Sequence, residues 1–154
     1  MEEPLYPEIV VAGCGNPLYA DDGFGTAVVE SLQGLELPEN VRVVDAGLGG
    51  PHFVFTLLDP ESTKKLIIVD IADFGGEPGE LRWLAVDELP VGSYRDAHSW
   101  DLTEPLQRIK DDIKIRVLVC QKKYVSAPEM VIGITGEVER AIPGAVSEIL
   151  KEIG

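Results

Sequence analysis

Two carboxylate positions and one histidine position, far apart in the 154-residue sequence, carry side chains that could share a metal ion. Asp21 and Asp22 follow a short apolar segment, Asp70 closes a second one, and His98 stands in a later polar region. Facing carboxylates repel each other unless a proton or a cation lies between them. Two carboxylates and an imidazole suit nickel, zinc or iron better than magnesium. We therefore expect a transition-metal site wherever the fold brings one of the paired aspartates, Asp70 and His98 together.

Each of these side chains also has a simpler interpretation. Asp21 and Asp22 could be solvated residues that cap a helix, and Asp70 could cap the turn after its strand. His98 could be a surface or helix-capping histidine. His52 follows three glycines and a proline, which is typical of a residue that starts a helix. The metal-site hypothesis therefore depends on the convergence of three segments.

The segment that should position the first carboxylates is residues 9–25, IVVAGCGNPLYADDGFG. Its β-branched start, at residues 9–11, predicts a buried strand that glycines close. Asn16 and Pro17 indicate a turn, and the apolar spacing at residues 26–32 predicts a helix. In an open α/β sheet, ligands bind in the loop between such a strand and its helix.

The rest of the chain alternates between predicted strands and helices, which indicates one α/β domain covering residues 1–154. We expect a three-layer sandwich: a mostly parallel, twisted sheet of about five strands with helices on both faces. Residues 80–85 alternate polar and apolar positions and predict an outer, antiparallel strand. In the common doubly wound order the first and third strands are neighbours, so Asp70 would face the first loop. Further strands are predicted at 41–46, 64–72 and 113–121, and helices at 53–58, 98–111 and 137–153.

Composition narrows the classes of partner and the compartment. The formal net charge of −14 argues against nucleic acid or an anionic membrane, and fits a cation or a basic segment of a partner protein. The negative charge could also serve only to keep the protein soluble. The chain has no long apolar run and no signal-peptide pattern, so we expect a cytoplasmic protein and a monomer. Cys14 and Cys120 are far apart and form no CxxC, which implies neither a zinc knuckle nor a disulfide framework.

Two other chemistries receive weaker support. Gly13 and Gly15 begin a dinucleotide-type pattern, but Leu18 occupies the place of its third glycine. Asp45, which ends the second predicted strand, is the one feature that favours a ribose contact. Cys14 could approach the crevice, but we interpret it as a small buried side chain because no histidine lies near it in sequence. Neither a Ser-His-Asp nor an HExxH arrangement is present.

The motifs GCGNPLYADDGFG and LIIVDIAD, followed by an isolated histidine that opens a helix, resemble the hydrogenase maturation endopeptidases. The resemblance extends from about Ile9 to the C-terminal helix. Residues 122–135 and the VLVCQ strand are most similar to the branch that serves deazaflavin-reducing hydrogenases of methanogens. Members of the family remove a short C-terminal extension from the large subunit of a nickel-iron hydrogenase after nickel has been inserted.

The resemblance implies metal-binding and catalytic roles for Asp22, Asp70 and His98. Asp22 stands where many relatives have glutamate. The implied metal is nickel carried by the substrate, which is the hydrogenase large subunit precursor, and zinc or cadmium could replace it in a crystal. Asp21 would orient a ligand or cap the helix. A non-enzymatic nickel carrier or maturation checkpoint with the same ligands is the alternative, and a nucleotide-binding domain is a third.

Overall fold

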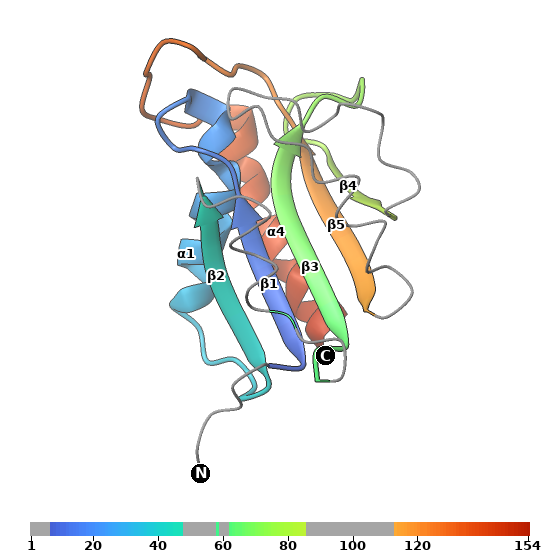
Figure 1. The fold of residues 1–154 in the computed structure, drawn as a ribbon. Helices are drawn as coiled ribbons and strands as arrows, with labels where there is room; N and C mark the ends of the chain where they lie inside the picture. The colour runs from blue at the N-terminus through green and yellow to red at the C-terminus, as the bar shows by residue number, and fades with distance from the viewer. Residues whose placement is uncertain (1–6, 48–57, 59–61, 86–112) are drawn as a thin grey trace.

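The computed structural model describes residues 7–47, 58, 62–85 and 113–154. Within them the chain forms a five-stranded sheet, two α-helices and one short 3-10 helix, η1 (Figure 1). In chain order the elements are β1 (Ile9–Cys14), η1 (Ala20–Gly23), α1 (Phe24–Gln33), β2 (Val41–Gly47), β3 (Lys65–Ala72), β4 (Leu81–Leu84), β5 (Lys114–Gln121) and α4 (Gly136–Ile153).

The sheet has the strand order β2-β1-β3-β5-β4. β1 pairs in parallel with β2 and β3, β3 pairs in parallel with β5, and β4 pairs antiparallel with β5 at the sheet edge. The connection between β3 and β4 spans only residues 73–80, which is too short for the crossover that a parallel neighbour needs. The predicted α/β architecture, the adjacent first and third strands and the antiparallel outer strand are all confirmed.

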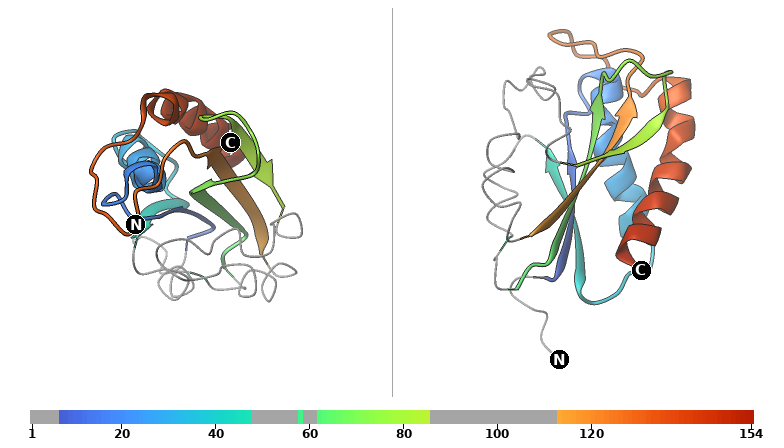
Figure 2. Two further views of the ribbon diagram at one scale, coloured as in Figure 1. Left: turned by 90° about the horizontal axis from the view of Figure 1, so that it is seen from above. Right: turned by 90° about the vertical axis from the view of Figure 1, so that its right-hand side faces the viewer.

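Both described helices cover the same face of the sheet (Figure 2). Apolar side chains of α1 and α4, such as Phe24 and Ile149, pack there against Val11, Ile67 and Leu118. Alternate residues of the same strands, including β1 and β3, form a second buried cluster on the opposite face. The helices predicted at 53–58 and 98–111 lie outside the described residues, except for position 58. Among those described, no helix combines the length and the apolar character needed to cross a membrane.

The structure corrects the prediction for the segment between β1 and α1. β1 continues beyond residue 11 to Cys14, and the two aspartates predicted to lie in a loop are part of η1. α1 then begins at Phe24 rather than at residue 26. Gly15, at φ +122°, makes the turn after β1, and a Cβ at Gly25 would lie 2.3 Å from the Cys14 carbonyl oxygen. The glycines thus let a helical turn begin directly against the strand end.

Candidate active site at the carboxyl end of the sheet

Asp22 is held at the carboxyl end of β1. It belongs to η1, its exposed fraction is 0%, and its Oδ2 accepts a hydrogen bond of 3.0 Å from the Asn16 backbone N–H. A Cβ at Gly15 would lie 2.1 Å from the Asp22 carbonyl oxygen and 3.3 Å from its Oδ1. The backbone of Gly15 therefore lies directly beneath this carboxylate, and a larger residue would displace it.

Asp70 lies in β3 with an exposed fraction of 1%. Its Oδ1 accepts a hydrogen bond of 2.7 Å from the N–H of Ile71. Side chains alternate along a strand, so Asp70 shares a face with Ile68 and Ala72, which belong to the second core cluster. Asp70 thus lies on the face of the sheet opposite α1 and α4.

Strand pairing brings Asp22 and Asp70 into the same region. Gly13 of β1 is in register with Val69 of β3, so Cys14, the last residue of β1, lies beside Asp70, and the chain then turns at Gly15 toward η1. η1 is also in contact with β3. The predicted proximity of the elements that carry these two aspartates is therefore observed. His98, the third predicted ligand, lies outside the described residues, as does His52.

Asp21 lies beside Asp22 in sequence but has a different set of partners. Its carboxylate accepts hydrogen bonds from the backbone N–H groups of Lys123 (2.9 Å), Tyr124 (2.8 Å) and Thr135 (2.7 Å), and from the Thr135 hydroxyl (2.8 Å). Neither η1 nor α1 has a side-chain cap. The predicted helix-capping role of Asp21 is therefore wrong. Its hydrogen bonds instead hold residues 123–135 against η1.

Gln121 is a structural residue of this edge that the sequence interpretation missed. Its Oε1 accepts hydrogen bonds from the N–H groups of Phe74 (2.9 Å) and Gly76 (3.1 Å), and its Nε2 donates to Asp73 (3.1 Å). The side chain is buried at the end of β5 and fixes the β3–β4 connection. The available signal was a lone amide that closes an apolar strand, because such a group needs partners once buried.

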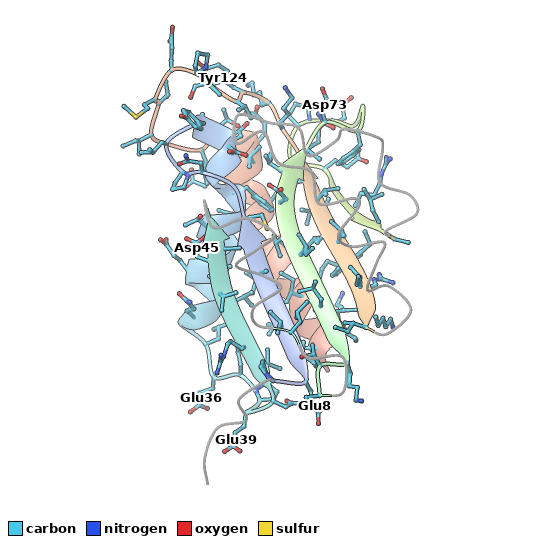
Figure 3. The ribbon with its side chains drawn as sticks, viewed as in Figure 1. Glu8, Glu36, Glu39, Asp45, Asp73 and Tyr124 are labelled. Carbon is cyan, nitrogen blue, oxygen red and sulfur yellow. The ribbon has the colours of Figure 1, made fainter. Side chains whose placement is uncertain are left out.

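The two cysteines and Asp45, the other candidate residues from the sequence, show no sign of a catalytic role. Cys14 and Cys120 form no disulfide, and both are fully buried. Burial, and secondarily the charge of Asp21, raises the pKa of Cys120 to about 12, so this thiol stays protonated and is a poor nucleophile. Asp45 lies two residues before the end of β2 and near the start of α1 (Figure 3), where the Thr26 hydroxyl donates a hydrogen bond of 3.3 Å to it. These positions agree with the interpretation of Cys14 as a packing residue.

The described carboxylates do not by themselves make a metal site. Burying two carboxylates close together is costly unless a cation or a proton offsets their charge. Among the described residues no three His, Cys, Asp or Glu side chains gather as a complete metal site. Asp22 and Asp70 are two buried oxygen donors on contacting elements, and carboxylate oxygens are ligands that a metal ion can take.

The sequence and the fold of this chain are both similar to those of known proteins. A sequence model of the hydrogenase maturation protease family matches residues 26–152. The chain is 46% identical to the coenzyme F420 hydrogenase subunit delta of Methanothermobacter thermautotrophicus, over 98% of each chain. It is 42% identical to a putative hydrogenase maturation protease of Methanocaldococcus jannaschii, over 95% of this chain and 96% of the relative.

Solved structures give the same result. The hydrogenase maturating endopeptidase HybD from E. coli superposes with a TM-score of 0.78 at 25% identity, covering 94% of this chain and 91% of that one. The resemblance to the deazaflavin branch is also supported. Coenzyme F420 is a deazaflavin, and the relative named as a subunit of the coenzyme F420 hydrogenase is similar to this chain over nearly its whole length. The chain belongs to the hydrogenase maturation protease family.

Proposed function

We propose that this protein is an endopeptidase that removes a C-terminal extension from the large subunit precursor of a nickel-iron hydrogenase after nickel insertion. Asp22, Asp70 and His98 bind the nickel that the precursor carries. The observation that supports this most directly is the near-complete burial of Asp22 and Asp70 on contacting elements. Family membership supports the proteolytic activity, and the name of the F420 relative suggests an F420-type hydrogenase as the source of the precursor.

The protein side chains in this proposal bind and orient the substrate. Asp22 is fixed by the Asn16 N–H and by the backbone of Gly15, so its carboxylate is preorganised before the precursor arrives. Asp70 lies in β3, which contacts η1, the element that carries Asp22. Bound nickel supplies Lewis acidity near the scissile carbonyl or lowers the pKa of a water. Cleavage waits for nickel because a precursor without the metal lacks the group that these carboxylates bind.

A second function remains open, in which the protein binds the loaded precursor without cutting it. The name "subunit delta" of the F420 relative favours a protein that stays with its hydrogenase, so this alternative has its own motive. It would use the same three ligands as a nickel carrier or a maturation checkpoint. The two proposals differ only in whether the precursor loses mass.

Incubation with nickel-loaded precursor and mass spectrometry of the large subunit separates the two functions. Endopeptidase activity predicts loss of a C-terminal peptide with the loaded precursor and no loss with the nickel-free precursor. A loaded precursor that binds but keeps its full mass would reject the enzyme and support the checkpoint. Equal cleavage of both precursors would reject the requirement for nickel.

The assignment of metal ligands is tested separately by nickel binding to the purified protein. We expect Asp22→Asn, Asp70→Asn and His98→Ala each to weaken nickel binding by at least about tenfold, because loss of even a supporting group costs ~10–100-fold. Asp45→Asn is the matched control, since Asp45 also lies in a parallel strand near its carboxyl end but is exposed. Isothermal titration calorimetry measures the four affinities. Unchanged affinity in any of the first three variants removes that residue from the site.

A further inference from the structure

Exposed apolar side chains gather on the segments around η1. Five of the exposed large apolar residues in the described part of the chain lie there, with Met130 70% and Ile132 82% exposed. We call these five residues the apolar rim, and one of them, Tyr124, is labelled in Figure 3. Clusters of this kind on a soluble domain are typical of contacts with another protein. The rim consists of Leu18, Tyr124, Met130, Val131 and Ile132.

A groove of about 440 Å³ opens beside this rim. One wall comes from residues 17–30, through Ala20 and Ala27, and the other from residues 132–142, through Ile132 and Ile142. The volume fits a few side chains and lies in the range of ligand-binding clefts. Ile132 belongs to both the rim and the groove, so the two form one continuous surface.

Two carboxylates give the groove its charge. Glu30 comes from one wall and Glu139 from the other, and both are exposed. None of the ion pairs among the described residues includes either of them, whereas the nearby Glu137 pairs with Lys123 at 2.6 Å and with Arg140 at 3.6 Å. Among the described residues that line the groove, none is basic. It is therefore complementary to an apolar side chain next to a lysine or arginine.

The groove is fixed relative to the candidate active site. Residues 131–135 are attached to η1 by the hydrogen bonds that Asp21 accepts and by a 2.7 Å bond from the Ala20 N–H to the Val131 carbonyl. η1 also carries Asp22 and contributes Ala20 and Gly23 to the groove. A segment bound in the groove is thus held within one helical turn of a proposed nickel ligand, with its binding surface already ordered.

We propose that this groove and the apolar rim bind a segment of the hydrogenase large subunit precursor in which a basic residue accompanies an apolar one. The proposal rests on the proposed function for the identity of the partner. A second copy of this chain is a poorer occupant, because the net charge of −14 would bring further carboxylates to Glu30 and Glu139. The basic residue interacts with these two glutamates while the apolar residue packs against Ile132 and Ile142.

The test compares groove variants with a charge-matched control. Glu30→Gln/Glu139→Gln removes both carboxylates from the groove, and Ile132→Ser removes the shared apolar side chain. Glu36→Gln/Glu39→Gln removes the same charge outside the groove, at the end of the molecule far from Tyr124 (Figure 3). All the changed residues are exposed, so each variant should fold, and circular dichroism verifies this. Full-length, nickel-loaded precursor is the probe, with its Kd measured by biolayer interferometry and its cleavage by kcat and KM.

We expect both groove variants to raise Kd and KM by roughly tenfold without changing kcat, and the control to match the wild-type protein. The double glutamine variant should also lose most of the salt dependence of binding. Wild-type Kd in both groove variants overturns the docking proposal, as does self-association of the protein through this face. If the wild-type protein binds precursor without cutting it, the enzyme proposal fails, while a raised Kd in the groove variants still supports docking.

Discussion

At the scale of single residues, two consecutive buried aspartates perform different tasks. Asp21 is surrounded by N–H and O–H donors from residues 123–135, whereas Asp22 lies against Gly15 and Asn16 at the end of β1. The resemblance implied a metal-binding role for Asp22, and for Asp21 a role in orienting a ligand or capping the helix. The structure separates them, because the two side chains of adjacent residues in η1 project in different directions. Asp21 holds residues 123–135 against η1 through hydrogen bonds, whereas Asp22 is the proposed ligand.

Replacing Asp21 by asparagine should lower the stability of the whole protein. The amide nitrogen of asparagine cannot accept a hydrogen bond, so donors among Lys123, Tyr124 and Thr135 would lose their acceptor in a buried place. We expect a loss of about 2–4 kcal/mol in the free energy of unfolding, measured by urea denaturation. Glu30→Gln makes the same chemical change at an exposed position and should stay within about 0.5 kcal/mol. Equal stability of Asp21→Asn and the wild-type protein would contradict the role of Asp21.

The two cysteines should be unreactive in the folded protein. Both are fully buried, and burial raises the pKa of Cys120 to about 12, so its reactive thiolate form is scarce at neutral pH. We expect Ellman's reagent to modify neither Cys14 nor Cys120 in native buffer and to modify both in denaturant. Fast modification of one thiol in the native state, at a rate well above that of unfolding, would show that a cysteine reaches the solvent near the site.

At the scale of elements, the close contact between the end of β1 and the start of α1 depends on glycine. A Cβ added to Gly25 would lie 2.3 Å from the Cys14 carbonyl oxygen and 2.8 Å from the Val69 carbonyl oxygen. Both atoms belong to the sheet backbone, so the strain can be relieved only by moving α1. Because η1 connects to α1 directly, this movement would also displace Asp22.

Gly25→Ala should therefore destabilise the protein by about 1–3 kcal/mol, which is typical of overpacking. Gly34→Ala is the matched control, because the nearest atom to its added Cβ is 3.6 Å away and its φ is −81°. Reduced chain entropy in the unfolded state should make that control neutral or slightly more stable, by up to about 1 kcal/mol. Thermal unfolding of the two variants measures the difference. Equal melting temperatures would show that α1 adjusts without cost.

The sequence predicted the sheet well because its signals are local. Each buried strand is a short β-branched run, and the short connection before β4 indicates an antiparallel neighbour. The placement of Asp70 at the edge beside the first loop followed from strand order. The partners of Asp21 could not be predicted, since they lie up to 114 residues away and are mostly backbone groups. A backbone donor has no sequence signature, so long-range bonds of this type emerge only from the fold.

At the scale of the whole molecule, the carboxylates differ in where they lie and in whether they stabilise the folded state. Asp22 and Asp70, the proposed ligands, lie at the carboxyl end of the parallel strands. Glu8, Glu36 and Glu39 lie at the opposite end of the molecule (Figure 3). Other carboxylates stabilise the folded state through specific contacts. The hydrogen bond from the Gln121 side chain, and to a smaller extent the one from the Gly75 N–H, lowers the pKa of Asp73. The hydrogen bond from the Lys123 side chain lowers the pKa of Glu137. These two groups link the stability of the molecule to acid pH.

Stability should fall below about pH 4.5, because a carboxylate with a lowered pKa in the folded state favours folding only while it is ionised. The contribution of Glu137 is complete above its ordinary value of 4.5, and that of Asp73 above 3.8; each is lost as the pH falls through the folded-state pKa. Protonation also relieves the repulsion within a chain of net charge −14, which acts in the opposite direction.

A pair of lysine variants isolates the specific contact from this general effect. Lys123→Met removes the partner of Glu137, whereas Lys114→Met removes an equal charge from the exposed start of β5. Urea midpoints measured between neutral pH and pH 3 should decline less steeply for Lys123→Met than for Lys114→Met and the wild-type protein. The difference arises because Glu137 would then titrate at nearly the same pH in the folded and unfolded states. Parallel curves for the two variants would mean that net charge alone controls acid stability, and that the Lys123–Glu137 contact does not help to hold residues 123–135 against α4.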